Sequence, residues 1–430
     1  MPTARGWSIG GIGLILWLVG RAYGTRPLEQ VGFALVALLF VALGVVRLGR
    51  HELQVSRRVT PERARAGRPV RVTLNFHNQG SGSAPLLLME DRIPRGVTGR
   101  ARFTLRGIEP GGKRETSYQL RPQARGRYAV GPLTVTVVDP FGLARSSSAT
   151  ALETVFLVHP QTESLALPRD LGERRTAASS ALKQPTGARG EDFYTLREYA
   201  HGDDLRKVHW PSTAKQGKYM IRQEETPWHT RSTIVLDDRR SAHERVGESS
   251  SFERSIQAAA SLLLLYDRTG YGFKLATAHG GGVGTGKGSE HLHRAMDMLA
   301  ILQASGPPAG DESLASRLTE IEARGIAEET LVLVCGHLDA HAAVALARCR
   351  RLYRQVLAVT FPPHRFGSGT TKQRWEGERE TVDATSLLGR SGVRTLILGP
   401  GEALGPAWGA LSSGRLRGGD PAWARKPELV

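Results

Sequence analysis

The stretch Ser232–Leu236, STIVL, is a short apolar run of the kind that forms a buried strand. The next patterned segment, Phe252–Tyr266 (FERSIQAAASLLLLY), has the spacing and length of a helix. Strand and helix patterns then alternate up to about residue 400. Further strands are expected at Phe273–Ala276, Leu331–Val334, Val356–Thr360 and Thr395–Leu398. Further helices are expected at Glu290–Leu302 and Ala342–Leu352. This alternation predicts a mostly parallel, doubly wound α/β sheet.

Directly upstream lies Gly190–Glu225, GEDFYTLREYAHGDDLRKVHWPSTAKQGKYMIRQEE. It mixes charges of both signs with aromatic side chains, and charges held beside buried aromatics must be paired or hydrogen-bonded. The segment is therefore not a solvated linker. Its residue order, Arg197-Glu198-Tyr199, then Gly202-Asp203-Asp204-x-Arg206, then His209-Trp210, resembles the signature of the domain of unknown function 58 family.

The resemblance implies a domain like the von Willebrand factor type A domain over residues 231–405. In type A domains a strand ends in Asp-x-Ser-x-Ser, whose oxygens help to hold a divalent cation, often Mg²⁺. Here the equivalent run, Asp237 to Ser241, has Arg239 in place of the middle serine. A guanidinium repels a cation, so we predict a degenerate metal site at Asp237 and Ser241 and no cofactor. Arg239 would be left to contact a carboxylate of a partner.

The signature segment has two interpretations. In the functional one, Asp203 and Asp204 act as acid/base or metal carboxylates beside His209, and Arg197 and Arg206 clamp an anion. In the structural one, which we favour, the two arginines pair with Glu198, Asp203 and Asp204. Gly202 then permits a turn and Trp210 anchors the segment on the sheet. We therefore assign no catalytic residue.

Two further motifs fall short of a site. Gly280–Gly288, GGGVGTGKG, resembles a phosphate loop, but Gly288 replaces the hydroxyl residue that reaches Mg²⁺, and a crossover loop is the favoured interpretation. His337 and His341 lie four apart but have no third ligand nearby in sequence, which favours surface histidines.

Residues 53–159 follow a period of two, as in Val70–Phe76 (VRVTLNF), with glycine and proline turns between runs. This pattern predicts an immunoglobulin-like β-sandwich. Asp139-Pro140 fits a turn in it, and Phe141 is expected to plug one end of the sandwich.

Two apolar runs open the chain, Gly6–Gly20 and Gln30–Val46. A cleaved signal peptide is the alternative to two spanning helices, but a second run directly behind the first argues against secretion. Arginines gather behind the second run, at Arg47, Arg50, Arg57, Arg58, Arg63 and Arg65. By the positive-inside rule we expect a multi-pass plasma-membrane protein with cytoplasmic soluble domains.

The net charge of +17 suggests an acidic partner, either anionic lipid or nucleic acid. The arginines are spread out and no nucleic-acid-binding motif is present, so specific nucleic-acid binding is not expected. The expected division is a hairpin at 1–50, a sandwich at 51–160, a linker and signature at 161–230, the α/β domain at 231–405 and a basic tail at 406–430.

Together these features predict a membrane-anchored scaffold or adaptor that binds another protein and does not catalyse a reaction. The family resemblance implies an ATPase of the MoxR type (AAA+) as the partner. A metal- or carboxylate-dependent hydrolase built on the signature segment is the alternative function.

Overall fold

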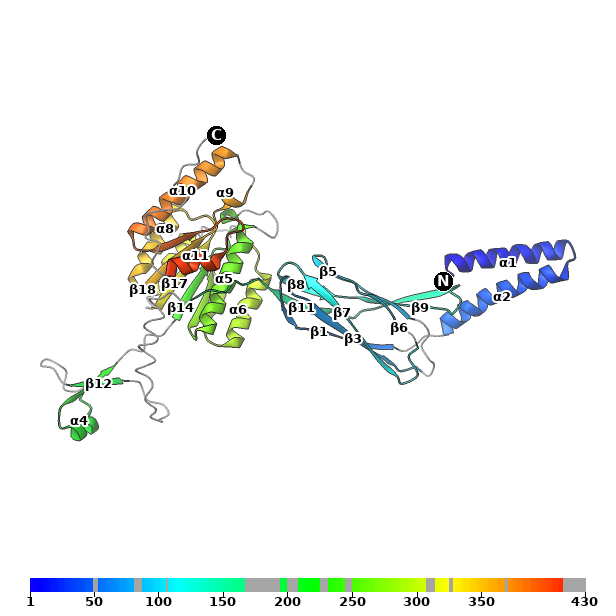
Figure 1. Ribbon diagram of the computed structural model, residues 1–430, viewed down its shortest axis with the longest axis horizontal. Coiled ribbons are helices and arrows are strands. Elements are labelled where there is room, and N and C mark those ends of the chain that lie inside the picture. Colours follow the sequence, from blue (N-terminus) through cyan, green and yellow to red (C-terminus); the bar gives the residue numbers. More distant parts are fainter. Residues whose placement is uncertain are drawn as a thin grey trace. The chain divides into compact units, whose positions relative to one another are not determined.

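A computed structural model describes residues 1–48, 53–80, 87–105, 107–166, 194–198, 208–224, 231–243, 250–306, 314–324, 328–367 and 370–412. The chain divides into two compact units, Met1–Gln161 and Thr162–Val430. The first holds two N-terminal helices and three β-sheets, and the second holds a small hairpin and a six-stranded sheet with helices (Figure 1).

The chain opens with α1 (Ala4–Ala22) and α2 (Arg26–Leu48), as the two apolar runs predict. Among the described helices, α2 alone is long and apolar enough to cross a membrane, over Arg26–Arg47. The two helices pack through glycines. A Cβ on Gly32 would lie 2.4 Å from the backbone nitrogen of Trp17 and 2.6 Å from the carbonyl oxygen of Gly13, so only glycine permits this approach.

The sheets that follow confirm the period-two prediction. Their strands are β1 (Leu53–Thr60), β2 (Arg63–Arg65), β3 (Val70–Asn78), β4 (Leu87–Asp91), β5 (Val97–Gly99), β6 (Arg102–Leu105), β7 (Lys113–Pro122), β8 (Gly126–Val130), β9 (Leu133–Val138), β10 (Arg145–Thr150) and β11 (Thr154–His159). They form sheets of order β1-β3-β7-β5, β10-β9-β4-β6 and β2-β11-β8. Every second residue of β3 from Val70 to Phe76 is buried, so one face of the strand builds the core.

A buried ion pair crosses this core. Arg57 of β1 donates to both carboxylate oxygens of Asp91 on β4, at 3.1 and 2.7 Å, and both side chains are fully buried. Arg57 also donates to the carbonyl oxygens of Val130 and Leu152, and Tyr118 donates to Asp91. The side chain of Arg57 is therefore part of the sandwich core and cannot reach a lipid headgroup.

The turn at Asp139-Pro140 is confirmed, because Gly142 N–H donates to the Asp139 carbonyl oxygen at 3.0 Å. Phe141 does not plug the sandwich as expected. Its side chain is 62% exposed, while the neighbouring Leu143 and Ala144 are buried.

In the second unit, β12 (Tyr194–Glu198) pairs antiparallel with β13 (Met220–Glu224), and the short helix α4 (Trp210–Gln216) lies between them in the chain. The larger sheet has the order β16-β15-β14-β17-β18-β19. Its strands are β14 (Arg231–Leu236), β15 (Gly272–Thr277), β16 (Gly282–Gly286), β17 (Glu328–Cys335), β18 (Tyr353–Thr360) and β19 (Arg394–Ile397). All neighbours are parallel except β15 and β16.

Helices cover both faces of this sheet (Figure 1). They are α5 (Ser251–Arg268), α6 (Ser289–Ile301), α7 (Leu314–Ala323), α8 (Ala340–Arg348), α9 (Pro363–Phe366), α10 (Thr371–Arg390) and α11 (Leu404–Ser412), with 3₁₀ turns η2 (Arg240–Ala242) and η3 (Cys349–Arg351). Ile234 and Leu236 pack in the core with α5, α6 and α11, whereas Val235 packs in the core with α7 and α8. The continuous apolar run STIVL is thus explained by burial on both faces.

The five strands predicted from sequence are all present, but two expectations fail. Gly280–Gly288 contains the antiparallel edge strand β16, so it forms neither a phosphate loop nor a crossover loop. The boundary predicted at 405 falls inside α11, whose Trp408 is buried in the core, so the packed chain extends to Ser412.

Candidate functional site

The candidate site lies where β14 and β17 end, at the centre of the sheet. From β14 the chain runs to β15 on one side, and the later β17 pairs on its other side. In open α/β sheets the crevice outside the carboxyl ends of strands at such a reversal is the usual place for a ligand. Asp237, Asp238 and Arg239 follow β14 here, and Gly336 to Asp339 follow β17.

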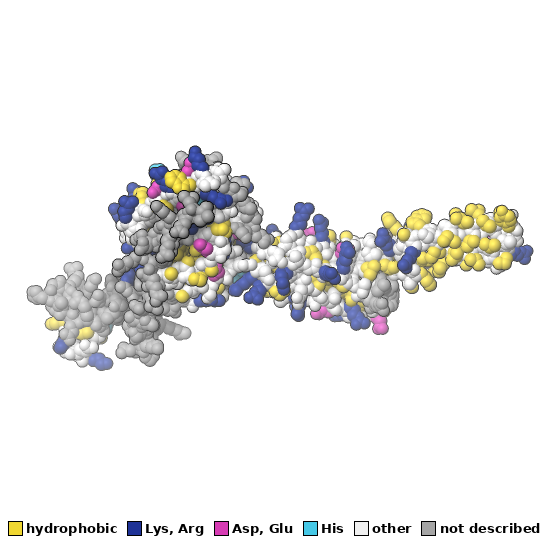
Figure 2. All heavy atoms as spheres, turned by 45° about the horizontal axis from the view of Figure 1, so that its top comes forward, with side chains coloured by type: hydrophobic (Ala, Val, Ile, Leu, Met, Phe, Trp, Pro, Cys, Tyr) yellow, Lys and Arg dark blue, Asp and Glu magenta, His cyan; other side chains and the backbone are white. Residues whose placement is uncertain are grey.

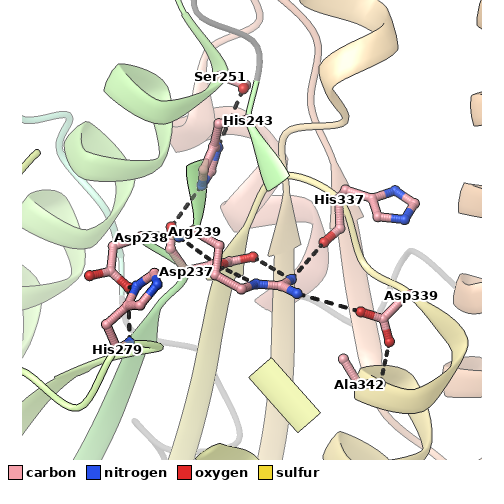
Figure 3. A network of polar contacts seen from close by, with 9 residues as sticks. All are labelled: Asp237, Asp238, Arg239, His243, Ser251, His279, His337, Asp339 and Ala342. Atoms are coloured by element: carbon pink, nitrogen blue, oxygen red, sulfur yellow. Dashed lines mark hydrogen bonds and ion pairs between the residues drawn. The ribbon is translucent and has the colours of Figure 1, made fainter. Parts of the chain in front are cut away.

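Asp237 and Arg239 form a closed ion pair at this edge (Figure 3). Arg239 Nε lies 2.9 Å from Asp237 Oδ1 and its Nη2 lies 2.9 Å from Oδ2, a bidentate arrangement. The backbone N–H of Arg239 also donates to Oδ1, at 3.1 Å. Asp237 is fully buried, so its negative charge requires this partner.

The guanidinium of Arg239 also reaches the β17 side. Its Nη2 lies 3.5 Å from the carbonyl oxygen of His337, and its Nη1 lies 3.6 Å from Asp339 Oδ2. The other oxygen of Asp339 accepts the N–H of Ala342 at 2.8 Å and so caps α8. Burial lowers the pKa of Arg239, but its hydrogen bond to Asp237 and the two carboxylate charges outweigh burial and raise the pKa overall. Arg239 therefore holds the ends of two strands together.

Two histidines support the same loop. His243 Nε2 donates to the Asp237 carbonyl oxygen at 2.7 Å, which leaves its Nδ1 to accept from Ser251 Oγ at 3.3 Å. Burial holds the pKa of His243 below its ordinary value, so the ring is neutral at pH 7. His279 donates from its backbone N–H and from Nδ1 to Asp238 Oδ1, at 3.1 and 2.9 Å.

A bound divalent cation does not fit the residues predicted for it. The guanidinium of Arg239 already contacts both carboxylate oxygens of Asp237, where a cation would need open oxygens. Ser241 lies exposed in η2. Among the described residues no cluster of three His, Cys, Asp or Glu side chains could hold a metal.

The cysteine beside this site is buried and held in its protonated form. Cys335 ends β17 and is fully buried, and burial raises the pKa of its thiol well above the ordinary value. A buried, protonated thiol packs as a small apolar side chain.

The signature residues are only partly described. Tyr199, Gly202, Asp203, Asp204 and Arg206 lie outside the described residues. Arg197 and Glu198 lie on β12, where they pair in register with Ile221 and Met220 of β13. The pairing of their side chains proposed from sequence therefore stays a prediction.

The helix α4 begins at Trp210, and His209 is the residue before it. The Nδ1 of His209 lies 2.8 Å from Ser212 Oγ, and its backbone N–H donates to Met220. Trp210 was expected to anchor the segment on the sheet. Its side chain is instead 64% exposed and meets the ring of Tyr219 edge-on at 6.4 Å.

Sequence reasoning placed Asp237 and Arg239 at the strand end but missed what Arg239 contacts. No site role was predicted for Asp339, although it follows the apolar run LVLV at the end of the neighbouring strand. Residues that follow adjacent parallel strands meet at one edge, and this rule would have brought Asp339 to Arg239.

Comparison with known proteins identifies one family. Residues 195–364, from β12 to α9, match the family model described as "Protein of unknown function DUF58". No curated protein matches the chain.

Solved structures give weak likenesses. An alkylpurine DNA glycosylase from Pseudomonas fluorescens shares 11% identity over 31% of this chain and 38% of its own, with a TM-score of 0.17. The CARDB domain of a Pyrococcus furiosus protein shares 14% over 25% of this chain and 91% of its own, with a TM-score of 0.18. A FixG-related protein from Vibrio parahaemolyticus shares 12% over 25% and 95%, with a TM-score of 0.17.

The chain spans well under two thirds of the glycosylase, and TM-scores of this size assign neither fold nor function. The residue order of the signature and the family match agree over the same segment. Residues 195–364 of this chain therefore form a domain of the DUF58 family.

Proposed function

We propose that this chain is a membrane-anchored scaffold that binds another protein at the carboxyl edge of its six-stranded sheet, without metal and without catalysis. The observation that carries the proposal is the Asp237–Arg239 pair. The guanidinium of Arg239 contacts both carboxylate oxygens of Asp237, which a metal-dependent docking site would need open, and it neutralises the buried carboxylate from within the chain. The edge is thus complete without a cation.

We assign the first unit's sheets to the immunoglobulin-like sandwiches and the second unit's sheet to the type A-like domains. The second assignment is supported by the order β16-β15-β14-β17-β18-β19, its single antiparallel edge strand and the aspartate after β14. Type A domains are binding modules for proteins, which favours a scaffold over an enzyme.

The anchor in this proposal consists of α1 and α2, both spanning the membrane, with the soluble units in the cytoplasm. The apolar length of α2 and the glycine-mediated packing of α1 against it support two spans. The arginines behind α2 support the orientation.

An ATPase of the MoxR type (AAA+) is the partner that we propose, on the strength of the family resemblance. The exposed arginine Arg240 lies at the carboxyl edge, and it suits an acidic patch on such a partner.

The test uses the full chain in lipid nanodiscs and a purified MoxR-type ATPase from the same organism. Binding is measured by surface immobilisation of the nanodiscs, with and without nucleotide, in Mg²⁺ and in a chelator. To remove Mg²⁺ from this chain alone, the nanodiscs are preincubated with chelator before the ATPase is added. We expect the ATPase to bind these nanodiscs as well as it binds untreated ones.

Charge reversal locates the surface. Arg240→Glu is expected to weaken binding, whereas Arg268→Glu, at the far end of α5 near the amino edge of the sheet, should leave it unchanged. No association under any nucleotide condition would remove the proposed partner. Equal effects of the two reversals would remove the proposed surface.

A further inference from the structure

The turn between β9 and β10 holds an aromatic side chain in solvent. Asp139 fixes the turn, because one carboxylate oxygen accepts the N–H of Phe141 at 2.8 Å and the other accepts the N–H of Ala144. Gly142 takes a φ of +70°, which favours glycine. The backbone of the turn is therefore held rigidly while the Phe141 ring points away from the core.

The same turn is bonded to the start of α1. Thr3 donates from its backbone N–H to the Leu143 carbonyl oxygen at 2.8 Å and from Oγ1 to the Gly142 carbonyl oxygen at 2.7 Å. Arg145 N–H donates to the Met1 carbonyl oxygen at 2.9 Å. Leu143 and Ala144 also share a small apolar cluster with Ala42 and Val46 of α2. Phe141 therefore sits beside the first turn of α1 and the last turns of α2.

This level of the hairpin has the composition of a membrane interface. Trp7, one turn into α1, is exposed, and so are Arg5, Arg47 and Arg145. The opposite end carries the exposed Tyr23 and the ion pair of Arg21 with Glu29. Aromatic and basic side chains at both ends of an apolar segment mark the headgroup levels of a bilayer.

Apolar side chains fill the space between these two levels. Figure 2 shows them over the visible face of the hairpin. The large exposed ones are Ile12, Leu14, Ile15, Leu18, Val19, Val31, Phe33, Phe40, Val41 and Val45. The 19 residues of α1 rise by about 28 Å, close to the thickness of a hydrocarbon core of about 30 Å.

We propose that Phe141 inserts into the interfacial layer of the bilayer that α2 crosses, with Arg145, Arg5 and Arg47 on the adjacent phosphates. The proposal rests on the membrane anchor proposed above. Lipid is the expected ligand because Phe141 lies at the headgroup level of the proposed hairpin and because arginines flank it. Besides α1 and α2, Phe141 would then be a third attachment of the sandwich to the membrane. Three attachments would fix the orientation of the sandwich relative to the bilayer.

The experiment places an environment-sensitive fluorophore at position 141. The full chain with Phe141→Cys is labelled with an NBD maleimide and reconstituted into phosphatidylcholine vesicles with a minor fraction of phosphatidylglycerol. Some vesicles carry a nitroxide lipid labelled near the headgroup. The two native cysteines, Cys335 and Cys349, are buried and should not react with the maleimide. The chain without the Phe141→Cys substitution is the labelling control and should remain unlabelled.

Val155→Cys is the matched control, because Val155 is an exposed apolar residue on β11 of the same unit. We expect the label at position 141 to shift its emission to the blue and to be quenched by the nitroxide, and the label at position 155 to do neither. Co-flotation with vesicles but equal, unquenched emission from both labels would overturn the insertion alone. Failure of the chain to float with vesicles would overturn the anchor and the insertion together.

Discussion

At the scale of the residue, the decisive contact is the bidentate bond from Arg239 to Asp237. They are two residues apart in sequence and close a buried pair, and Asp339, after β17, adds a second carboxylate to the same guanidinium. The pair neutralises the buried carboxylate of Asp237 from within the chain. Because the pair is buried, breaking it should lower the free energy of unfolding of the second unit.

Arg239→Ala should destabilise the second unit by about 3–5 kcal/mol, because it leaves Asp237 buried and unpaired. Adding Asp237→Asn to Arg239→Ala should recover part of that loss, since the uncompensated charge is removed. Hydrogen exchange of the β14 and β17 amides measures the change. Arg240→Ala, at an exposed side chain, is the control and should stay within about 0.5 kcal/mol. A double variant less stable than Arg239→Ala alone would contradict the pairing.

His243 should make the second unit sensitive to acid. Burial lowers its folded-state pKa, so below the ordinary value of 6.5 the unfolded chain binds a proton that the folded chain resists. The stability that neutral His243 contributes is complete above pH 6.5 and is lost as the pH falls toward the depressed pKa. Thermal unfolding midpoints between pH 7 and pH 5 test this.

His243→Gln should flatten that part of the pH profile, whereas His341→Gln, at an exposed position on α8, should leave it unchanged. If the profile of His243→Gln keeps the original slope, another group carries the acid sensitivity.

The sequence located these residues only in part. The position of Asp237 follows from the buried run STIVL, because a strand that ends there must present its next residue at the carboxyl edge. Asp339 pairs with Arg239 across 100 residues of sequence, and His279 bonds to Asp238 across 41 residues. The local sequence pattern carries no information on such distant contacts.

At the scale of the element, glycine spacing decides how the two helices of the hairpin meet. Gly6, Gly13 and Gly20 are the buried residues of α1 and lie seven apart, so they share one side of the helix. Gly32 of α2 faces this seam and touches the backbone of α1. In the membrane hairpin that we propose, close packing of this kind would hold the two helices together, because lipid supplies no hydrophobic driving force between helices.

Gly32→Ala should loosen the hairpin, since its Cβ would meet the backbone of Trp17 and Gly13, and overpacking of this kind costs about 1–3 kcal/mol. Gly44→Ala on the same helix is the matched control, because a Cβ there meets nothing within 4 Å. Spin labels at Leu18 and Phe33 report the distance between the helices. We expect a broadened distribution for Gly32→Ala only. Identical distributions for both variants would rule out the glycine seam.

Elements with a strong hydrophobic pattern in their own sequence were predictable, and elements stabilised only by tertiary packing were not. The apolar strands β14, β17 and β18 were recognised because both of their faces are buried. The strand β16 was missed because its sequence, GVGTG, has little strand propensity and depends on pairing with β15. The helix α10 was missed because only Thr381, Ala384 and Leu388 of its 20 residues are buried, although Thr370 and Gln373 form a capping box.

At the scale of the whole molecule, the proposal joins an anchor, a sandwich and a docking domain in one chain. Its orientation is open to a direct test. A fluorescent protein fused after Val430 should be bright, and alkaline phosphatase fused at the same point should be inactive, because we place the soluble units in the reducing cytoplasm. Active phosphatase at the carboxyl end would place these units outside and overturn the orientation.

The claim on which the rest depends is that Arg239 stands in for a metal ion at the edge of the sheet. Isothermal titration of the purified chain with Mg²⁺ tests it most directly, beside the variant Arg239→Ser, which removes the guanidinium and completes the Asp-x-Ser-x-Ser pattern from Asp237 to Ser241. We expect no saturable binding to the native chain and saturable binding to the variant. Saturable binding to the native chain that disappears with Asp237→Asn would contradict the claim.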